Sequence, residues 1–190
     1  MPIKNPLAYT VTCLRLVIAI TTIFWLLSGN WLWGAVGIAC TAISHLPAVV
    51  IPQSRLRPAC ELCVSALLSA HVALGMQADF YETSAVYDKL IHAAGFGAIT
   101  AIVISALSRY RDVHAPNLKP AALAFAAIGI AVSLGTAWEI FEFSLDRTGL
   151  FQTQRGLNDT MLDLIADVVG ALAVVGAHAV FNGLRPRLAA

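Results

Sequence analysis

The chain has 190 residues, of which 58% are hydrophobic and only 12% are charged, and its formal net charge is +1. Soluble domains usually carry about 25% charged residues, so half that share, with long apolar runs, is typical of a polytopic membrane protein. The near-neutral balance gives no basic field of the kind that nucleic-acid binding requires, and we expect a single integral membrane domain over residues 1–190.

Six apolar segments are long enough to cross a membrane, since a spanning helix needs about 20 apolar residues. Turn-forming or polar stretches separate them, at 28–30, 52–58, 116–120 and 148–156. The predicted fold is therefore all-α, a bundle of six transmembrane helices at about 8–28, 31–51, 59–79, 87–109, 120–144 and 158–183.

Basic residues in short loops predict the orientation of the bundle, because such residues stay in the cytoplasm. Every second connection carries them, whereas the alternate loops are neutral, acidic or mixed. The pattern predicts that both termini are cytoplasmic, and it rests on Lys4, Arg15, Arg55, Arg57, Arg109, Arg111, Lys119, Arg185 and Arg187.

The second and third segments contain residue types that often serve as ligands. Cys60 and Cys63 form a C-x-x-C pair, but at the predicted cytoplasmic start of a helix we interpret them as small packing residues. His45 and His71 are interpreted as hydrogen-bonded core residues, and so is His178 in the sixth segment. His71 stays a candidate for an outer polar cluster, because its segment also ends outside.

Ionisable side chains enter the last three segments from the predicted outer side. Their spacing of three or four residues puts each set on one face of its helix. At a rise of about 1.5 Å per residue, His92, Glu139 and Asp163 each lie roughly 6–8 Å inside the ends of their helices. Three distant segments therefore bring ionisable groups to one depth: Asp88 and His92, then Glu139, Glu142 and Asp146, then Asp159, Asp163 and Asp167.

Structural roles explain some of these residues equally well. Asp159 and Asp88 can cap their helices, where acids also suit the helix dipole, and Glu142 can belong to a solvated helix end. Asp163 and Asp167 lie deeper than the first turn, so capping does not explain them. A polar network without chemistry would account for the whole set.

A cation-binding site is the more specific interpretation of these ionisable residues. Several carboxylates with one imidazole form an oxygen-rich set that suits a divalent metal such as Mg²⁺, Mn²⁺, Ca²⁺, Fe²⁺ or Zn²⁺. Lys89 and Arg155 could hold an anion such as a lipid phosphate, or only neutralise the acids. His92 and Glu139 are the candidates for a catalytic role. We expect the metal ligands among Asp88, His92, Glu139, Glu142, Asp159 and Asp163, with Asp167, Asp146 and Trp138 as support or relay.

Three motifs carry a resemblance to a known family: Tyr87-Asp-Lys-Leu-Ile-His92, Ala137-Trp-Glu-Ile-Phe-Glu142, and Gln154 followed by Asn158-Asp-Thr-Met-Leu-Asp163 and Gly170. Together they resemble the YjdF-like bacterial inner-membrane proteins, over about half of the chain. More distantly, the Asp-Lys-x-x-His start and the late acidic helix resemble the VanZ-like family, which is associated with resistance to teicoplanin-type antibiotics. The resemblance implies a small multi-pass protein of the bacterial inner membrane and brings no assigned activity with it.

Three functions remain open from the sequence. The first is a metal site open to the outer leaflet that acts on, or binds, a lipid-linked substrate. The second is a proton- or cation-coupled transporter that uses the acidic stripe as a relay, with Asp167 as the inward step. The third is a structural or regulatory membrane subunit whose acids only bind one another.

Overall fold

The computed structural model describes residues 6–52, 54–84, 86–149 and 152–188, and of residues 182–188 the backbone alone. These residues form helices and their connections, with no strand among them. Six helical stretches are long and apolar enough to cross a membrane, which confirms the all-helical, six-span prediction. The side on which the termini lie stays a prediction.

The chain divides into two compact units, Met1–Ile91 and His92–Ala190. The division falls inside one continuous helix, α6 (Tyr87–His114). The single integral domain expected from the sequence stays a prediction.

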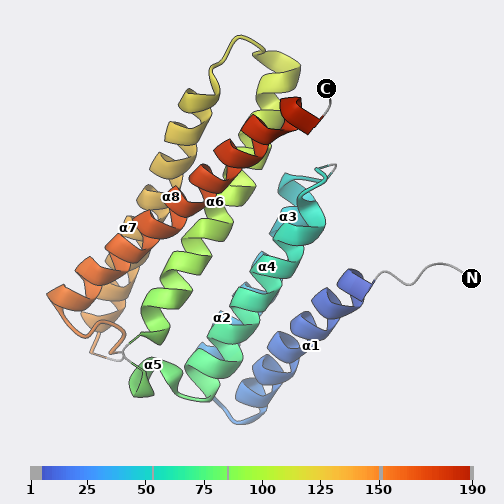
Figure 1. The fold of residues 1–190 in the computed structure, drawn as a ribbon. Coiled ribbons are helices and arrows are strands. Elements are labelled where there is room, and N and C mark those ends of the chain that lie inside the picture. Colours follow the sequence, from blue (N-terminus) through green and yellow to red (C-terminus); the bar gives the residue numbers. More distant parts are fainter. Residues whose placement is uncertain (1–5, 53, 85, 150–151, 189–190) are drawn as a thin grey trace, which may run out of the picture. The chain divides into compact units, whose positions relative to one another are not determined.

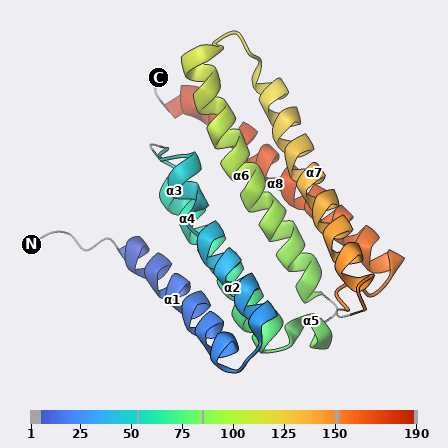
Figure 2. The same ribbon diagram turned by 180° about the vertical axis from the view of Figure 1, so that it is seen from behind.

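The first unit packs around its first helix, α1, which contacts both α2 and α4 (Figures 1 and 2). A tight turn with Gly29 at φ +77° leads from α1 into α2, and the Asn30 side chain accepts from the backbone N–H of Trp33. The helices of this unit are α1 (Pro6–Leu27), α2 (Trp31–Ile43), α3 (Leu46–Val50), α4 (Arg57–Ser69), a π-helix (Ala70–Gln77) and α5 (Phe80–Thr83).

The second span is interrupted, although the sequence predicted one continuous helix over 31–51. Pro47 has no N–H to offer the carbonyl of Ile43, so the helical ladder breaks there and resumes as α3. The Ser44 carbonyl at this break accepts a hydrogen bond from Arg15 Nη2 of α1, at 2.6 Å. Arg15 therefore supplies a donor to one backbone carbonyl at the break, that of Ser44, within an apolar span.

The third span runs from α4 into the π-helix, and both of these segments pack on α1. The buried core of the unit here is Ile18, Trp25, Cys40 and Val72. Trp25 Nε1 also donates to Gln77 Oε1 at 2.7 Å, which ties the end of the π-helix to α1.

His71 of the π-helix contacts Tyr81 of α5: His71 Nδ1 and the Tyr81 hydroxyl lie 2.5 Å apart. This contact agrees with the interpretation of His71 as a hydrogen-bonded core residue. Cys60 is buried and Cys63 exposed, and both are free thiols.

The second unit consists of α6 from His92 onward, with α7 (Pro120–Asp146) and α8 (Leu157–Leu188). Glycines let these helices approach closely. A Cβ atom on Gly170 would overlap the carbonyl oxygen of Ala93 on α6, and one on Gly135 of α7 would overlap the Asp167 carboxylate of α8. The close approach brings the acids of α8 next to the histidine of α6.

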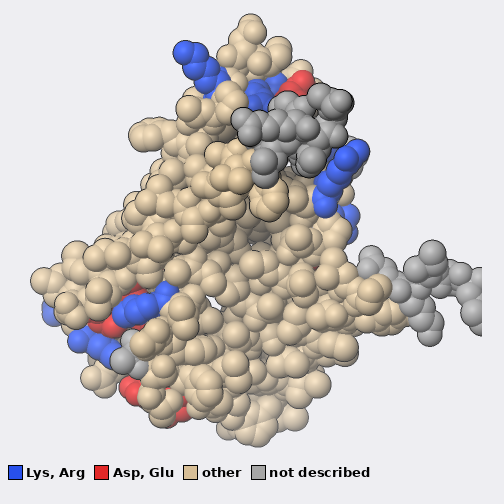
Figure 3. Space-filling model, viewed as in Figure 1, with Lys and Arg blue, Asp and Glu red and all other residues tan. Residues whose placement is uncertain are grey.

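The exposed surface is that of a membrane protein. Large apolar side chains such as Phe125 (81% exposed) and Ile165 (58% exposed) point away from the helix contacts. In the space-filling view the charged side chains gather in patches, and broad uncharged surface lies between them (Figure 3).

Candidate metal centre

His92 is the centre of a buried polar cluster in the second unit. It lies one turn inside α6, is 7% exposed, and its ring stacks on Phe96 with centroids 6.0 Å apart. Its Nδ1 lies 2.9 Å from Oδ1 of Asp167, which is 1% exposed. An Nδ1–H donated to this carboxylate puts the lone pair of the ring on Nε2, the atom that can then accept a proton or bind a metal ion.

Two further carboxylates face that second ring nitrogen. Glu139 Oε1 from α7 and Asp163 Oδ1 from α8 each lie 4.0 Å from His92 Nε2. Two metal–ligand bonds of about 2.0–2.2 Å span such a separation. Both carboxylates are almost fully buried, with 4% and 2% exposure. Three helices that are distant in sequence therefore bring a carboxylate oxygen of Glu139 and one of Asp163 to the same imidazole nitrogen.

The charge of the cluster needs compensation. Glu139, Asp163 and Asp167 are three acids around one imidazole, and buried carboxylates that share a site must protonate, pair with a cation or bind a metal. Among the described residues, Glu139 Oε1 and Asp167 Oδ2 are buried without a hydrogen-bond partner. Buried polar atoms rarely lack one, so a bound cation at Glu139 Oε1 would satisfy both the charge and the geometry.

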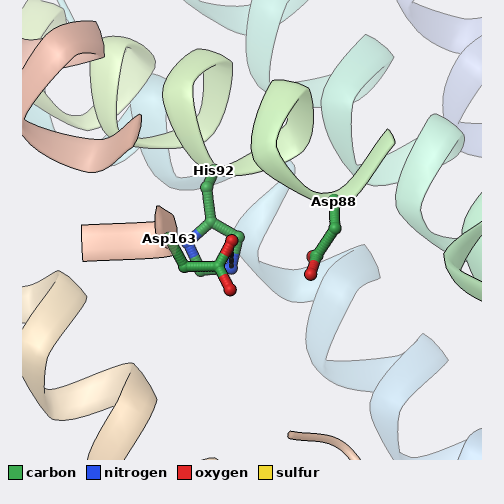
Figure 4. A group of neighbouring side chains, drawn as sticks. All are labelled: Asp88, His92 and Asp163. Atoms are coloured by element: carbon green, nitrogen blue, oxygen red, sulfur yellow. Dashed lines mark ion pairs between the residues drawn. The ribbon is translucent and has the colours of Figure 1, made fainter. Parts of the chain in front are cut away.

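Asp88 adds a carboxylate one helical turn before His92, on the same continuous helix. One oxygen of Asp88, one ring nitrogen of His92 and one oxygen of Asp163 all lie within 4.8 Å of one another. Figure 4 shows the two α6 side chains projecting from the same side of the helix, with Asp163 beside the imidazole. Lys89 Nζ lies 3.2 Å from Asp88 Oδ2, which favours the neutralising role for this lysine.

Gln154, which belongs to one of the three sequence motifs, binds Glu139, a contact that the sequence did not predict. Its Nε2 donates to the Glu139 carbonyl at 3.1 Å and to Oε2 at 3.2 Å. Asp146 in turn accepts from the backbone N–H of Thr153 at 2.7 Å and of Gln154 at 2.9 Å. A single amide side chain in a polar loop has no periodic spacing from other polar residues that would indicate a contact. Its position in the sequence next to the acidic motifs is the only signal that points to it.

The remaining predicted residues lie elsewhere on α7 and α8 or, for Arg155, in the loop between them. Asp159 is half-buried in the first turn of α8, where its Oδ2 accepts from the backbone N–H of Arg155 at 3.3 Å, as a helix-start residue would. The Arg155 side chain is exposed, and Glu142 is half-buried at the end of α7. Trp138 is 39% exposed and packs on Phe141. Ligand roles for Asp159 and Glu142, and an anion-binding role for Arg155, stay predictions.

A pocket of about 480 Å³ lies on the α7 and α8 side of the cluster. Its polar lining includes Glu139, Gln154 and Thr160, and its apolar lining includes Phe143 and Leu157. Phe143 and Leu157 are 56% and 74% exposed, so in a spanning bundle they would face lipid. The pocket therefore joins a cluster carboxylate to a lipid-facing surface.

Comparisons with known proteins identify the family. A family model described as "Predicted membrane protein (DUF2238)" matches residues 7–183. A protein of Thermotoga maritima, described as an uncharacterized protein, is 35% identical over 114 residues, which are 58% of this chain and 56% of that protein. The chain thus spans little more than half the length of that relative, and no solved structure matches. Because the family model covers all six spans, the chain belongs to the DUF2238 family of membrane proteins.

Proposed function

We propose that this multi-pass membrane protein binds one divalent metal ion through His92 Nε2, Glu139 and Asp163, with Asp88 as a further ligand. The observation that carries the proposal is the pair of buried carboxylate oxygens, each 4.0 Å from the same imidazole nitrogen. Asp167 supports it by holding the other ring nitrogen, an arrangement that metal-bound histidines commonly have.

The substrate that we propose for this site is a lipid-linked molecule. A divalent metal can activate a bound water and clamp a phosphate group, and the pocket beside Glu139 opens among lipid-facing side chains. In this proposal the apolar side chains Phe143 and Leu157 take the lipid chain. Gln154 and Thr160 contact the polar group, and His92 or Glu139 moves the proton of the reaction.

The bacterial inner membrane is the location that we propose. The family match is consistent with the YjdF-like resemblance and gives no support to the VanZ-like one. With both termini cytoplasmic, the cluster lies in the outer half of the membrane, where the substrate would arrive from the outer leaflet.

A relay for transported protons or cations has less support. Such a path would continue inward from Asp167 through further polar groups. Around Asp167 the helices instead pack through Gly135 and Gly170. Ala131, one turn before Gly135, and Ala171, next to Gly170, are fully buried. This packing favours a closed site, with Asp167 as the residue that orients the imidazole.

Elemental analysis of the purified protein tests the proposal directly. After equilibration with Mg²⁺, Mn²⁺, Fe²⁺, Zn²⁺ or Ca²⁺ and removal of free ions, we expect close to one equivalent of one metal. Glu139→Gln and Asp163→Asn keep the side-chain shape but remove a charged ligand, so they should weaken binding at least about tenfold. The matched control is Glu82→Gln, on an exposed position of α5, which should bind as the wild type does.

Two results would overturn the metal proposal. One is a folded wild type, by size exclusion and circular dichroism, that retains none of these metals. The other is full metal binding by both Glu139→Gln and Asp163→Asn. A wild type without metal whose thermal stability nevertheless changes in these variants would instead point to the structural network.

A further inference from the structure

A second pocket, of about 400 Å³, lies in the first unit, where α1 and α4 both begin. Because both helices are candidate membrane spans that start here, this pocket sits at a membrane interface. It shares no residue with the metal centre, and nothing in the metal proposal depends on it.

Two arginines form the polar end of this pocket, which we name the arginine pocket. Arg57 is held in place: its Nε lies 3.1 Å from Glu61 Oε1, and its Nη1 donates to the Pro52 carbonyl at 3.2 Å. Arg55 is exposed and makes no hydrogen bond or ion pair with any residue that the structure describes. Because the charges of Arg57 and Glu61 neutralise each other, the pocket carries one net positive charge, that of Arg55.

The wall that α1 contributes to the arginine pocket is apolar. It is formed by the first turns of α1, through Leu7, Ala8 and Val11, and Val11 is 5% exposed. The pocket thus pairs a cationic end with an apolar wall along a membrane-spanning helix, a combination that matches an amphiphile rather than a soluble anion.

We propose that the arginine pocket binds an anionic phospholipid of the leaflet at this end of the bundle. Guanidinium groups match phosphate oxygens in a two-pronged geometry, and basic pockets between transmembrane helices bind anionic headgroups. The phosphate lies against Arg55 and the remaining donor of Arg57, and an acyl chain follows Leu7 and Val11. The volume falls in the range of about 300–1,000 Å³ that is usual for ligand pockets.

Native mass spectrometry of the detergent-purified protein tests this site, because both ends of the bundle are then accessible. The probes are phosphatidylglycerol and, with the same acyl chains, zwitterionic phosphatidylcholine. The wild type should retain phosphatidylglycerol in preference to phosphatidylcholine. Arg55→Gln should weaken that retention about fivefold, the loss expected for one basic contact near a membrane surface.

Lys119→Gln is the matched control. Lys119 is also exposed, its side chain makes no hydrogen bond or ion pair with the described residues, and it belongs to the same predicted cytoplasmic face. It should retain phosphatidylglycerol as the wild type does, because it lies outside the pocket. Because Arg55 is exposed and makes no hydrogen bond or ion pair with the described residues, its substitution should leave the fold intact, which circular dichroism would verify.

Four outcomes would overturn the proposal. They are equal retention of the two lipids, unchanged retention by Arg55→Gln, an equal loss in Lys119→Gln, and displacement of the lipid by inorganic phosphate at low millimolar concentration. The last outcome would identify a free anion as the ligand. None of these results changes the metal content, so the two proposals succeed or fail separately.

Discussion

His92 shows how much of the site depends on single atoms. Its helical position predicts a buried polar residue, and its neighbours decide the chemistry. Asp167 Oδ1 accepts a hydrogen bond from His92 Nδ1 at 2.9 Å. The lone pair of the ring is then on Nε2, which faces Glu139 and Asp163. Without Asp167 the ring could reverse its tautomer and point a proton at the ligand position.

The first prediction concerns this orienting bond. Asp167→Asn keeps the side-chain volume but replaces the carboxylate with an amide, which no longer favours one tautomer. We expect metal affinity to fall about 10- to 100-fold, the usual effect of losing such a partner, as measured by metal titration of the apo-protein. Asp112→Asn, at an exposed position, is the control, and an unchanged affinity in Asp167→Asn would contradict the assigned role.

Gln154 and Asp159 show the limit of reasoning from residue spacing. Asp159 shares a helical stripe with Asp163, yet its carboxylate accepts from the backbone at the start of α8. Gln154 belongs to no stripe, yet it holds Glu139 through two hydrogen bonds. Spacing identifies which residues share a helix face, and it does not reveal which groups a loop folds back onto them.

At the scale of elements, the six spans were predicted closely because their lengths and apolar content are local properties. The fifth helix, expected over 120–144, is observed as Pro120–Asp146. The fourth, expected over 87–109, continues to His114. The apolar pattern stops at Arg109, whereas the backbone hydrogen bonds of a helix continue into polar sequence.

Two details of the elements were not predicted. Pro47 breaks the second span, and the third ends in a π-helix, Ala70–Gln77. The proline was visible in the sequence, but its consequence depends on whether a neighbour satisfies the freed backbone. At this break Arg15 of another helix donates to the Ser44 carbonyl.

The second prediction tests the close packing of α6 and α8. Gly170→Ala places a Cβ atom against the backbone carbonyl of Ala93, and backbone cannot rotate away as a side chain can. We expect stability to fall by about 1–3 kcal/mol, although alanine alone favours a helix by about 0.5–1 kcal/mol over glycine. Unfolding of the detergent-solubilised protein in sodium dodecyl sulfate measures the change.

Gly176 provides the matched control for Gly170 on the same helix. A Cβ atom there meets open space, so Gly176→Ala should be neutral or slightly stabilising. If Gly170→Ala unfolds at the same concentration of sodium dodecyl sulfate as the wild type, α6 and α8 do not approach as closely as the structure indicates.

At the scale of the whole molecule, orientation decides which leaflet the metal centre faces. The short-loop arginines and lysines predict cytoplasmic termini, and Glu139 and Asp163 then lie in the outer half. The family match establishes a membrane protein, and it carries no information on this direction.

The third prediction tests that orientation with reporter fusions. Green fluorescent protein fused at the C-terminus, or after residue 117, should fluoresce because it folds in the cytoplasm. Alkaline phosphatase fused after residue 149 should be active because it reaches the outside. Reversed activities at these positions would place the metal centre in the inner half and remove the outer-leaflet route for its substrate.

The sequence by itself determined the membrane class, the six helices and the three of them that carry ionisable groups, because apolar length and helical period are properties of local sequence. It also identified Asp88, His92, Glu139 and Asp163 as candidates. The tertiary structure alone decided which atoms meet. The hydrogen bond of Asp167 to Nδ1 and the position of Gln154 on Glu139 depend on how closely helices approach and where a loop returns, and such contacts between distant residues leave no period in the chain.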